Sequence, residues 1–264
     1  MTDFQQTALE LAAEQQTPAW LAALRQQGVS TWAAAAWPGR KTEHWKYISL
    51  APLQQCEQLG WSSESDDVAL DAVEQIELDA IRLVFVNGRF NAARSSALPA
   101  GVVRFADANT EQQALIQQHL GKVVDSERHM FAALSNAWAA DGVLLHVARG
   151  HKLEKPVYIV NVSTAQANPV AASQRVLVVL EDNAEAELIE HYASDSVSQN
   201  GFVNSLTEVV VGNNAQVQHY RINLEQEDLL HVGGVHVNLQ RDARFHGFTL
   251  AQGSRLKRID YQVN

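Results

Sequence analysis

The stretch Asp182-Asn183-Ala184-Glu185-Ala186 decides the fold, because two similar stretches follow it: Asn213-Asn214-Ala215-Gln216-Val217 and Arg241-Asp242-Ala243-Arg244-Phe245. Each is a polar turn, then an alanine, then the start of a β-rich run. Recurrence at a nearly constant interval is typical of stacked coils, in which each coil covers the apolar face of its neighbour. The repeat fits a parallel β-helix and fits equally a β-sandwich with evenly spaced hairpins, so periodicity alone leaves both folds open.

Three histidines follow a second, less regular spacing. His191, His219 and His246 recur at a slightly shorter interval than the alanines do. Stacked on successive coils, their imidazoles could bind a transition metal. Because the spacing drifts and no carboxylate recurs with it, the pattern favours a row of polar residues on the solvent face. His231 and His236 are separated by an odd number of positions in one β-rich run, which puts them on opposite faces and makes them a poor ligand pair.

The chain divides into three parts by local pattern. Residues 1–80 form an N-terminal helical region, residues 81–142 a mixed α/β transition segment, and residues 143–264 a β-helix core. The fold class is therefore mostly β with a helical N-terminus. The β-rich runs of the core lie at residues 143–147, 157–162, 175–180, 186–191, 205–211, 216–222, 231–239, 245–250 and 256–263.

Helix-capping and turn-forming residues predict the helices and the hairpin that precede the core. Thr17-Pro18 predicts a helix start and Gly28 its end, and a second short helix at residues 32–36 ends before Pro38-Gly39. A strand at residues 81–86 precedes Asn87-Gly88, a strong hairpin-turn signal. Further helices are predicted at residues 111–120 and 128–138, and a short one within the acidic stretch 64–67.

Composition excludes several classes of function. The net charge of −10 argues against a nucleic-acid binder, and no apolar run approaches the length of a membrane span. Phosphate-binding and hydrolase motifs are absent. The single cysteine, Cys56, cannot form an intrachain disulfide or supply a cluster's ligands. Its sequence neighbours offer no positive charge to stabilise a thiolate, which favours an inert thiol. With no leader pattern at the N-terminus, we expect a cytoplasmic protein.

The segment Arg40-Lys41-Thr42-Glu43-His44-Trp45-Lys46-Tyr47-Ile48 combines two aromatic and three basic residues. One interpretation is that Trp45 and Tyr47 attach an N-terminal extension to the core while the basic residues stay in water. The other is a docking surface, since Trp, Tyr and Arg carry much of the energy of protein interfaces. Both can hold together. The candidate residues of this motif are Arg40, Lys41, Glu43, Trp45, Lys46 and Tyr47.

Four segments together resemble the SufB/SufD family of the SUF iron–sulfur cluster assembly system. The motif at residues 40–47 looks like the N-terminal signature of its SufD branch, with His44 where Asn is frequent. Residues 81–90 resemble a strand-and-turn segment, Lys155-Pro156-Val157-Tyr158 resembles the entry to the β region, and residues 185–192 are similar to a segment within it.

The resemblance implies a right-handed parallel β-helix and resolves the choice of fold. It also implies a non-catalytic scaffold that pairs with a SufB paralogue and the SufC ATPase, with a transient iron–sulfur cluster and reduced flavin handled by the complex. No flavin or cluster site can be assigned to residues here. The alternatives are a β-helix enzyme that processes acidic polysaccharides, which should carry a recurring row of acidic residues, and an assembly module without metal chemistry.

Family members are longer than this chain. The resemblance therefore implies that the β-helix is C-terminally incomplete, and that the part holding a SufC-docking region and a Cys-x-His segment is missing. An open coil end leaves unpaired backbone groups and apolar surface, so we expect self-association through that end.

Overall fold

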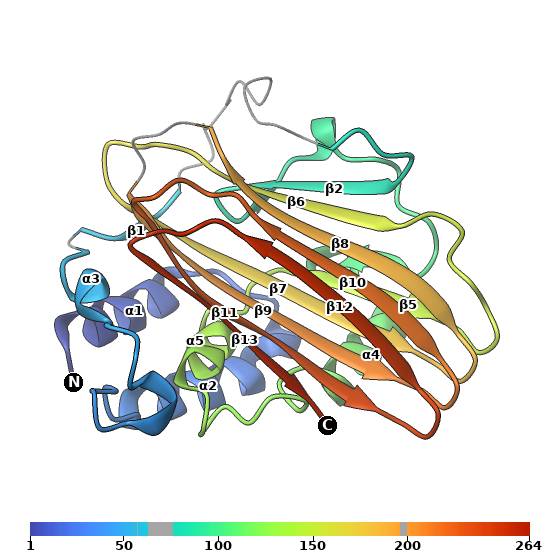
Figure 1. The fold of residues 1–264 in the computed structure, drawn as a ribbon, viewed down its shortest axis with the longest axis horizontal. Coiled ribbons are helices and arrows are strands. Elements are labelled where there is room, and N and C mark those ends of the chain that lie inside the picture. The colour runs from blue at the N-terminus through green and yellow to red at the C-terminus, as the bar shows by residue number, and fades with distance from the viewer. Residues whose placement is uncertain (57, 63–75, 196–199) are drawn as a thin grey trace.

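A computed structural model describes residues 1–56, 58–62, 76–195 and 200–264. Two sheets stack against each other, and helices cover the outer face of one of them (Figure 1). The seven-stranded sheet has the order β13-β11-β9-β7-β5-β4, with β1 also paired to β7, and the six-stranded sheet has the order β12-β10-β8-β6-β2-β3. The core strands are β5 (Val143–Val147), β6 (Val157–Ser163), β7 (Val170–Leu180), β8 (Glu185–Ser194), β9 (Gly201–Val211), β10 (Gln216–Asn223), β11 (Leu229–Leu239), β12 (Arg244–Ala251) and β13 (Leu256–Val263).

Successive strands from β6 onward alternate between the two sheets, and their pairings are parallel. This connectivity makes a parallel β-solenoid, so the predicted β-helix is confirmed and the β-sandwich is wrong. The nine predicted β-rich runs all lie within strands, and the runs at 143–147 and 256–263 match β5 and β13 residue for residue. The main apolar cluster fills the space between the sheets, with Leu83, Leu145, Val178, Leu188 and Val235 among its members.

The repeated stretches form the same turn in each coil. Asn183, Asn214 and Asp242 have φ values of 60°, 53° and 60°, a left-handed conformation that Asn and Asp tolerate better than most residues. Gln216 pairs with Glu185 on one side and with Arg244 on the other. The alanine before each strand therefore stacks on the alanine of the next coil, which confirms the alanine register.

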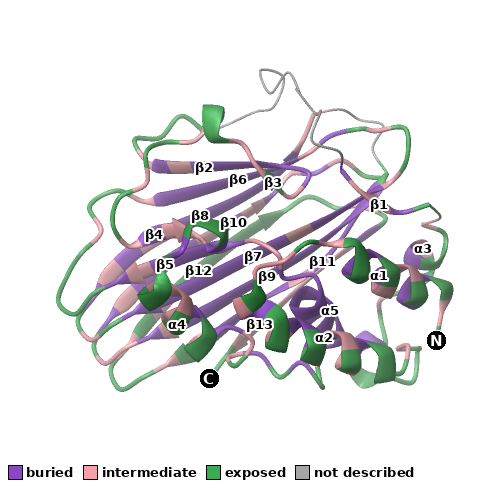
Figure 2. Cartoon of the chain, turned by 180° about the vertical axis from the view of Figure 1, so that it is seen from behind, coloured by how far each residue is buried: buried purple, intermediate pink, exposed green. Residues whose placement is uncertain are grey.

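Helices form the second layer, on the outer face of the seven-stranded sheet (Figure 2). They are α1 (Asp3–Glu14), η1 (Ala19–Leu21), α2 (Ala22–Ala34), η2 (Glu43–Trp45), α3 (Ala51–Gln54), η5 (Phe105–Asp107), α4 (Thr110–His119) and α5 (Met130–Ala137). One further helical turn, η4 (Ala92–Arg94), lies instead beside strand β2 (Ile81–Val86) of the six-stranded sheet. The predicted helices at 111–120 and 128–138 are confirmed as α4 and α5. An aromatic cluster joins the layers, and Trp138 Nε1 donates to the carbonyl of Ala8 at 2.9 Å.

The prediction that a helix ends at Gly28 is wrong. One helix, α2, runs through Gly28 to Ala34 and absorbs most of the second short helix predicted at 32–36. Gly28 lies instead where α2 crosses α5, and a Cβ atom there would be 2.3 Å from the backbone nitrogen of Ala137. The glycine therefore permits close helix packing. The short helix predicted at 64–67 lies outside the described residues.

The predicted hairpin at Asn87-Gly88 is confirmed. Strands β2 (Ile81–Val86) and β3 (Arg89–Phe90) are antiparallel, and both turn residues have positive φ, as a type I′ turn requires. Strand β2 also pairs in parallel with β6, so it continues the six-stranded sheet. The short strands β1 (Gly60–Trp61) and β4 (Val102–Arg104) border the other sheet. The division at residues 80 and 142 stays a prediction.

Strands β12 and β13 lie at the edges of their sheets, each paired on one side among the described strands. Four of their large apolar side chains are exposed: Phe248, Leu250, Tyr261 and Val263. At the same register positions of the inner strands, Val235 and Val237 of β11 are buried, and Tyr220 and Ile222 of β10 are partly buried.

Candidate functional site: the motif segment and the solenoid interior

The motif segment, residues 40–48, has an inward part, which is Trp45 with the backbone of His44, and an outward part, which includes Lys46 and Tyr47. Trp45 is 9 % exposed and packs against Phe131 in the aromatic cluster, whereas Tyr47 is 88 % exposed. The interpretation in which both aromatics attach the segment to the core is therefore right for Trp45 and wrong for Tyr47. Arg40, Lys41 and Lys46 are exposed, as predicted, and Glu43 is exposed as well.

The inward part is fixed to β13. The guanidinium of Arg258 lies 4.0 Å from the centre of the Trp45 ring and donates to the carbonyl of His44 at 2.5 Å. Arg128 Nη2 lies 3.3 Å from Nε2 of His44. These contacts hold the motif against the last described coil, although Arg258 lies near the opposite end of the sequence.

His191, His219 and His246 do not share a row. The strand register places Ile222 beside His191, and Leu188 and Gly247 beside His219. The predicted row on the solvent face is also wrong for two of them, because His191 and His219 are buried and only His246 is exposed. His231 and His236 do point to opposite sides: His231 into the solenoid, and His236 toward His129 with ring centres 4.9 Å apart.

A buried polar network inside the solenoid was not predicted. Its centre is Glu190, whose Oε1 accepts a hydrogen bond from Thr207 and lies 2.7 Å from His219 Nε2, while Oε2 accepts from Tyr192 at 2.7 Å. Arg221 Nη1 lies 3.5 Å from Oε2, completing the charge balance. All of these side chains are fully or almost fully buried.

A second carboxylate continues the network one coil later. Glu225 contacts Nδ1 of His231, and its Oε2 lies 2.9 Å from Nζ of Lys257. Ser205 connects the two halves, because its hydroxyl lies 2.6 Å from Arg221 Nη2 and 2.7 Å from His231 Nε2. The interior thus carries two acids matched by two permanent cations.

Electrostatics keep both acids ionised. Burial alone would raise the pKa of Glu190, but the charge of Arg221 and the hydrogen bond from His219 lower that pKa to about 2. Burial likewise opposes ionisation of Glu225, but His231 and Lys257 lower the pKa of its carboxyl below the usual value. Burial raises the pKa of Tyr192 well above its ordinary value, so this phenol stays a hydrogen-bond donor. Each buried carboxylate therefore has a cationic partner, so the network acts as a structural element of the solenoid.

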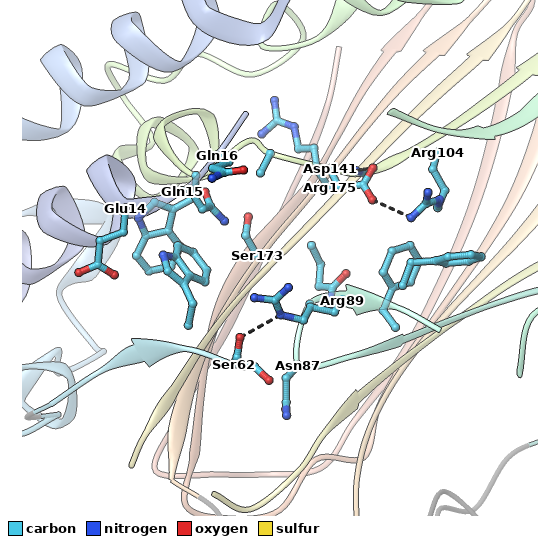
Figure 3. Close-up of a pocket in the computed structure, with 18 residues that line it drawn as sticks. Glu14, Gln15, Gln16, Ser62, Asn87, Arg89, Arg104, Asp141, Ser173 and Arg175 are labelled. Carbon is cyan, nitrogen blue, oxygen red and sulfur yellow. Dashed lines mark hydrogen bonds and ion pairs between the residues drawn. The ribbon is translucent and has the colours of Figure 1, made fainter. Parts of the chain in front are cut away.

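A cleft of about 680 Å³ lies between the end of α1, the β2–β3 hairpin and β7 (Figure 3). Arg89 Nε donates to the carbonyl of Ser62 at 2.9 Å, and Arg104 Nη1 lies 3.3 Å from Oδ2 of Asp141. Burial raises the pKa of Asp141, although two backbone N–H groups and Arg104 oppose this. The lining residues that the structure describes include neither His nor Cys, so they hold no nucleophile paired with an imidazole base.

Cys56 is partly buried and follows α3. Burial raises the pKa of its thiol, although the charge of Arg255 acts in the opposite direction. This direction favours the interpretation of Cys56 as an inert thiol, which stays a prediction. Among the described residues, no three His, Cys, Asp or Glu side chains are grouped so that they could hold a metal ion.

Comparison with known families accounts for both layers of this arrangement. Residues 2–159 match the family model of the SufBD protein N-terminal region. Residues 161–264 match that of the SUF system FeS cluster assembly, SufBD core domain. The chain belongs to the SufBD family.

Individual SufBD proteins show the same likeness. The chain is 25 % identical over 240 residues to the iron–sulfur cluster assembly SufBD family protein slr0076 of Synechocystis, covering 86 % of this chain and 52 % of that protein. It is 27 % identical over 231 residues to Escherichia coli SufD, with the same two coverages. For Bacillus subtilis SufD the identity is 28 % over 220 residues, covering 77 % and 48 %. The chain spans about half the length of these curated relatives.

The SufBD match supports the resemblance found in the sequence. It gives no support to the polysaccharide-processing alternative, and the solenoid interior carries paired charges in place of a recurring acidic row. Within the described part of the chain, no helix is long and apolar enough to cross a membrane.

The interior network could have been found from the alternation Leu188, Glu190, Tyr192, which places charge on an inward-facing row.

Proposed function

We propose that this chain acts as a non-catalytic scaffold subunit in iron–sulfur cluster assembly, pairing with a SufB paralogue and the SufC ATPase. The observation that carries the proposal is the match of both SufBD regions over residues 2–159 and 161–264. The paired interior charges fit a framework role, since the Ser205 hydroxyl beside His231 is completely buried and also contacts Arg221 within the same network. The cluster is then the cargo of the complex, and this chain alone holds no stable cluster.

The experiment is a tagged pull-down of this chain from cells that co-express SufB and SufC. Recovery of SufB supports the proposed pairing, and recovery of SufC as well extends it to the ATPase. Recovery of neither protein contradicts the proposal. A Trp45→Ala variant, which should lose its packed N-terminal layer, serves as the control for specific association.

A second measurement separates the scaffold from an assembly module without metal chemistry. SufB is reconstituted anaerobically with iron and sulfide, with and without this chain, and cluster absorbance is followed. Faster or more complete formation with the chain present supports the scaffold. Equal formation favours the plain module. Reduced flavin, added in a further arm, tests whether the complex uses it.

A further inference from the structure

A surface groove of about 500 Å³ separates the outward part of the motif from the start of β13. Tyr47 and Pro52 border one side, and Arg255 and Leu256 border the other. We propose that this groove binds an acidic, extended peptide segment of a partner protein. The inference stands apart from the proposed function, because its test needs no other component of cluster assembly.

The aromatic side of the groove is Tyr47. Its ring is 88 % exposed, although the nearby Trp45 is buried in the aromatic cluster. Lys46 Nζ lies 5.2 Å from the centre of the Tyr47 ring, so a cation and an aromatic face are presented together. Tyrosine beside a basic group is a combination that contributes strongly to protein interfaces. An aliphatic or aromatic side chain of a peptide can pack on this ring.

The two chain segments that border the groove are basic, although the protein as a whole is acidic. Residues 40–55 and 252–258 contain six Lys or Arg residues and one acidic residue, Glu43, in a chain whose net charge is −10. Two of the cations are already neutralised: Lys257 by buried Glu225, and Arg258 by Asp260 at 2.8 Å.

Four cations of these two segments remain exposed: Arg40, Lys41 and Lys46 precede the groove residues in the chain, and Arg255 lines the groove itself. Arg255 Nη1 lies 3.9 Å from the exposed carboxylate of Asp228, and Nη2 donates to Gln55 at 3.2 Å. An exposed pair at that distance is weak, so a peptide carboxylate can replace Asp228 at little cost. Basic groups concentrated on an acidic protein steer an acidic partner to this place.

A peptide suits the groove better than other anions. Nucleic acid requires cations spread along its backbone, and the strongly acidic remainder of the chain would repel it. Anionic membranes require a broader basic face for the same reason. An extended peptide advances roughly 3.3 Å per residue, so neighbouring side chains can reach Tyr47 and Arg255 at the same time.

The probe is a fluorescein-labelled, glutamate-rich peptide with one central phenylalanine, titrated with the full chain and followed by anisotropy. We expect saturable binding that weakens as salt is raised. A Lys46→Glu/Arg255→Glu variant should bind about tenfold or more weakly. Tyr47→Ala should weaken binding several-fold while leaving the salt dependence in place. The matched control, Lys152→Glu/Arg241→Glu, makes the same change in net charge at exposed sites elsewhere and should bind like the parent chain.

Absence of saturable binding overturns the proposal, and so does an equal loss of affinity in the groove and control variants. Tighter binding of a DNA oligonucleotide or of phosphatidylserine vesicles than of the peptide, at the same salt, also overturns it. A benzoylphenylalanine in place of the central phenylalanine provides a second measurement. Photocrosslinking should label the tryptic fragments 47–82 or 245–255, which carry groove residues, and labelling confined to other fragments contradicts the site.

Discussion

Nη2 of Arg175 lies 2.6 Å from Oε2 of Glu208, and both side chains are completely shielded from solvent. Glu208 also accepts hydrogen bonds from the backbone nitrogens of Gly121 and Val123, at 2.7 and 2.9 Å. Arg175 donates in addition to the side chain of Asn136 at 2.9 Å. One ion pair therefore connects two strands of the solenoid with the segment between α4 and α5 and with α5 itself.

Glu208→Ala should destabilise the protein by roughly 3–5 kcal/mol, because it leaves the guanidinium of Arg175 buried without its counter-charge. Chemical denaturation followed by tryptophan fluorescence measures this loss. The double variant Arg175→Met/Glu208→Leu removes both charges and should recover much of the stability. A single variant as stable as the parent chain would show that water reaches the pair.

Gly28→Ala should destabilise the protein, although alanine is normally the better helix former by about 1 kcal/mol. The added Cβ atom would lie 2.3 Å from the nitrogen of Ala137, so α2 and α5 must move apart, at a cost of about 1–3 kcal/mol or more. The comparison is Gly39→Ala, where no atom lies within 4 Å and little change is expected. Thermal denaturation measures the melting temperatures of the two variants, and equal melting temperatures would contradict the packing argument.

The two aromatics of the motif should respond differently to truncation. Trp45→Ala removes a buried ring and the platform under Arg258, and should cost roughly 3–5 kcal/mol of unfolding free energy. Tyr47→Ala removes an exposed ring and should change stability by less than about 0.5 kcal/mol. Urea titrations of both variants distinguish them. Similar losses would mean that Tyr47 packs on the protein in solution.

His236 should make stability depend on pH. Burial, with the charges of His129 and Arg175, lowers its pKa from 6.5 to about 4. The unfolded chain therefore binds the proton first, and the stability contributed by neutral His236 is complete above about pH 6.5 and is lost as the pH falls toward 4. Between pH 7 and pH 5 the loss should be about 2 kcal/mol.

Substitution tests the origin of this effect. His236→Asn should flatten the pH dependence between 7 and 5, whereas His151→Asn, at an exposed position, should leave it unchanged. Denaturation curves at several pH values measure both slopes. An unchanged slope in His236→Asn would assign the effect to another group.

Self-association should occur through the exposed edges of β12 and β13. Phe248 is 56 % and Leu250 48 % exposed on an edge strand, a combination that favours edge-to-edge pairing. Light scattering should report dimers or larger species, and Phe248→Lys/Leu250→Lys should shift the population toward monomer. A clean monomer of the parent chain would contradict this expectation.

Local signals in the sequence predicted the fold well. The left-handed turn residues Asn183, Asn214 and Asp242 are encoded by their own conformational preference, so the alanine that follows each of them gave the correct coil register. The prediction of a histidine row was wrong because the three histidines do not occupy the same position relative to these alanines. His191 is the seventh position after the alanine of its coil, whereas His219 is only the fourth, so the rings fall out of line.

The interior network and the split of the motif depend on contacts between distant residues. Glu190 meets Arg221 only because β8 and β10 pair in the register that sets these two residues side by side, and nothing local at either residue signals the partner. Trp45 and Tyr47 are near neighbours and similar in character, but only the position of Phe131 and Arg258 decides which ring is buried. Gly28 was misread because a helix-ending glycine and a helix-crossing glycine look the same in sequence.

The two corners of each coil differ in how much change in chain length they can absorb. The turns at residues 181–184, 212–215 and 240–243 are equal in length and hold a left-handed position, while the difference in length between successive coils falls around the opposite corner. For protein engineering, an epitope or sensor loop inserted between the exposed residues Glu227 and Asp228, with the buried Glu225 kept in place, should leave the stacking intact. The same graft at Asn214 would interrupt the ladder that sets every later strand.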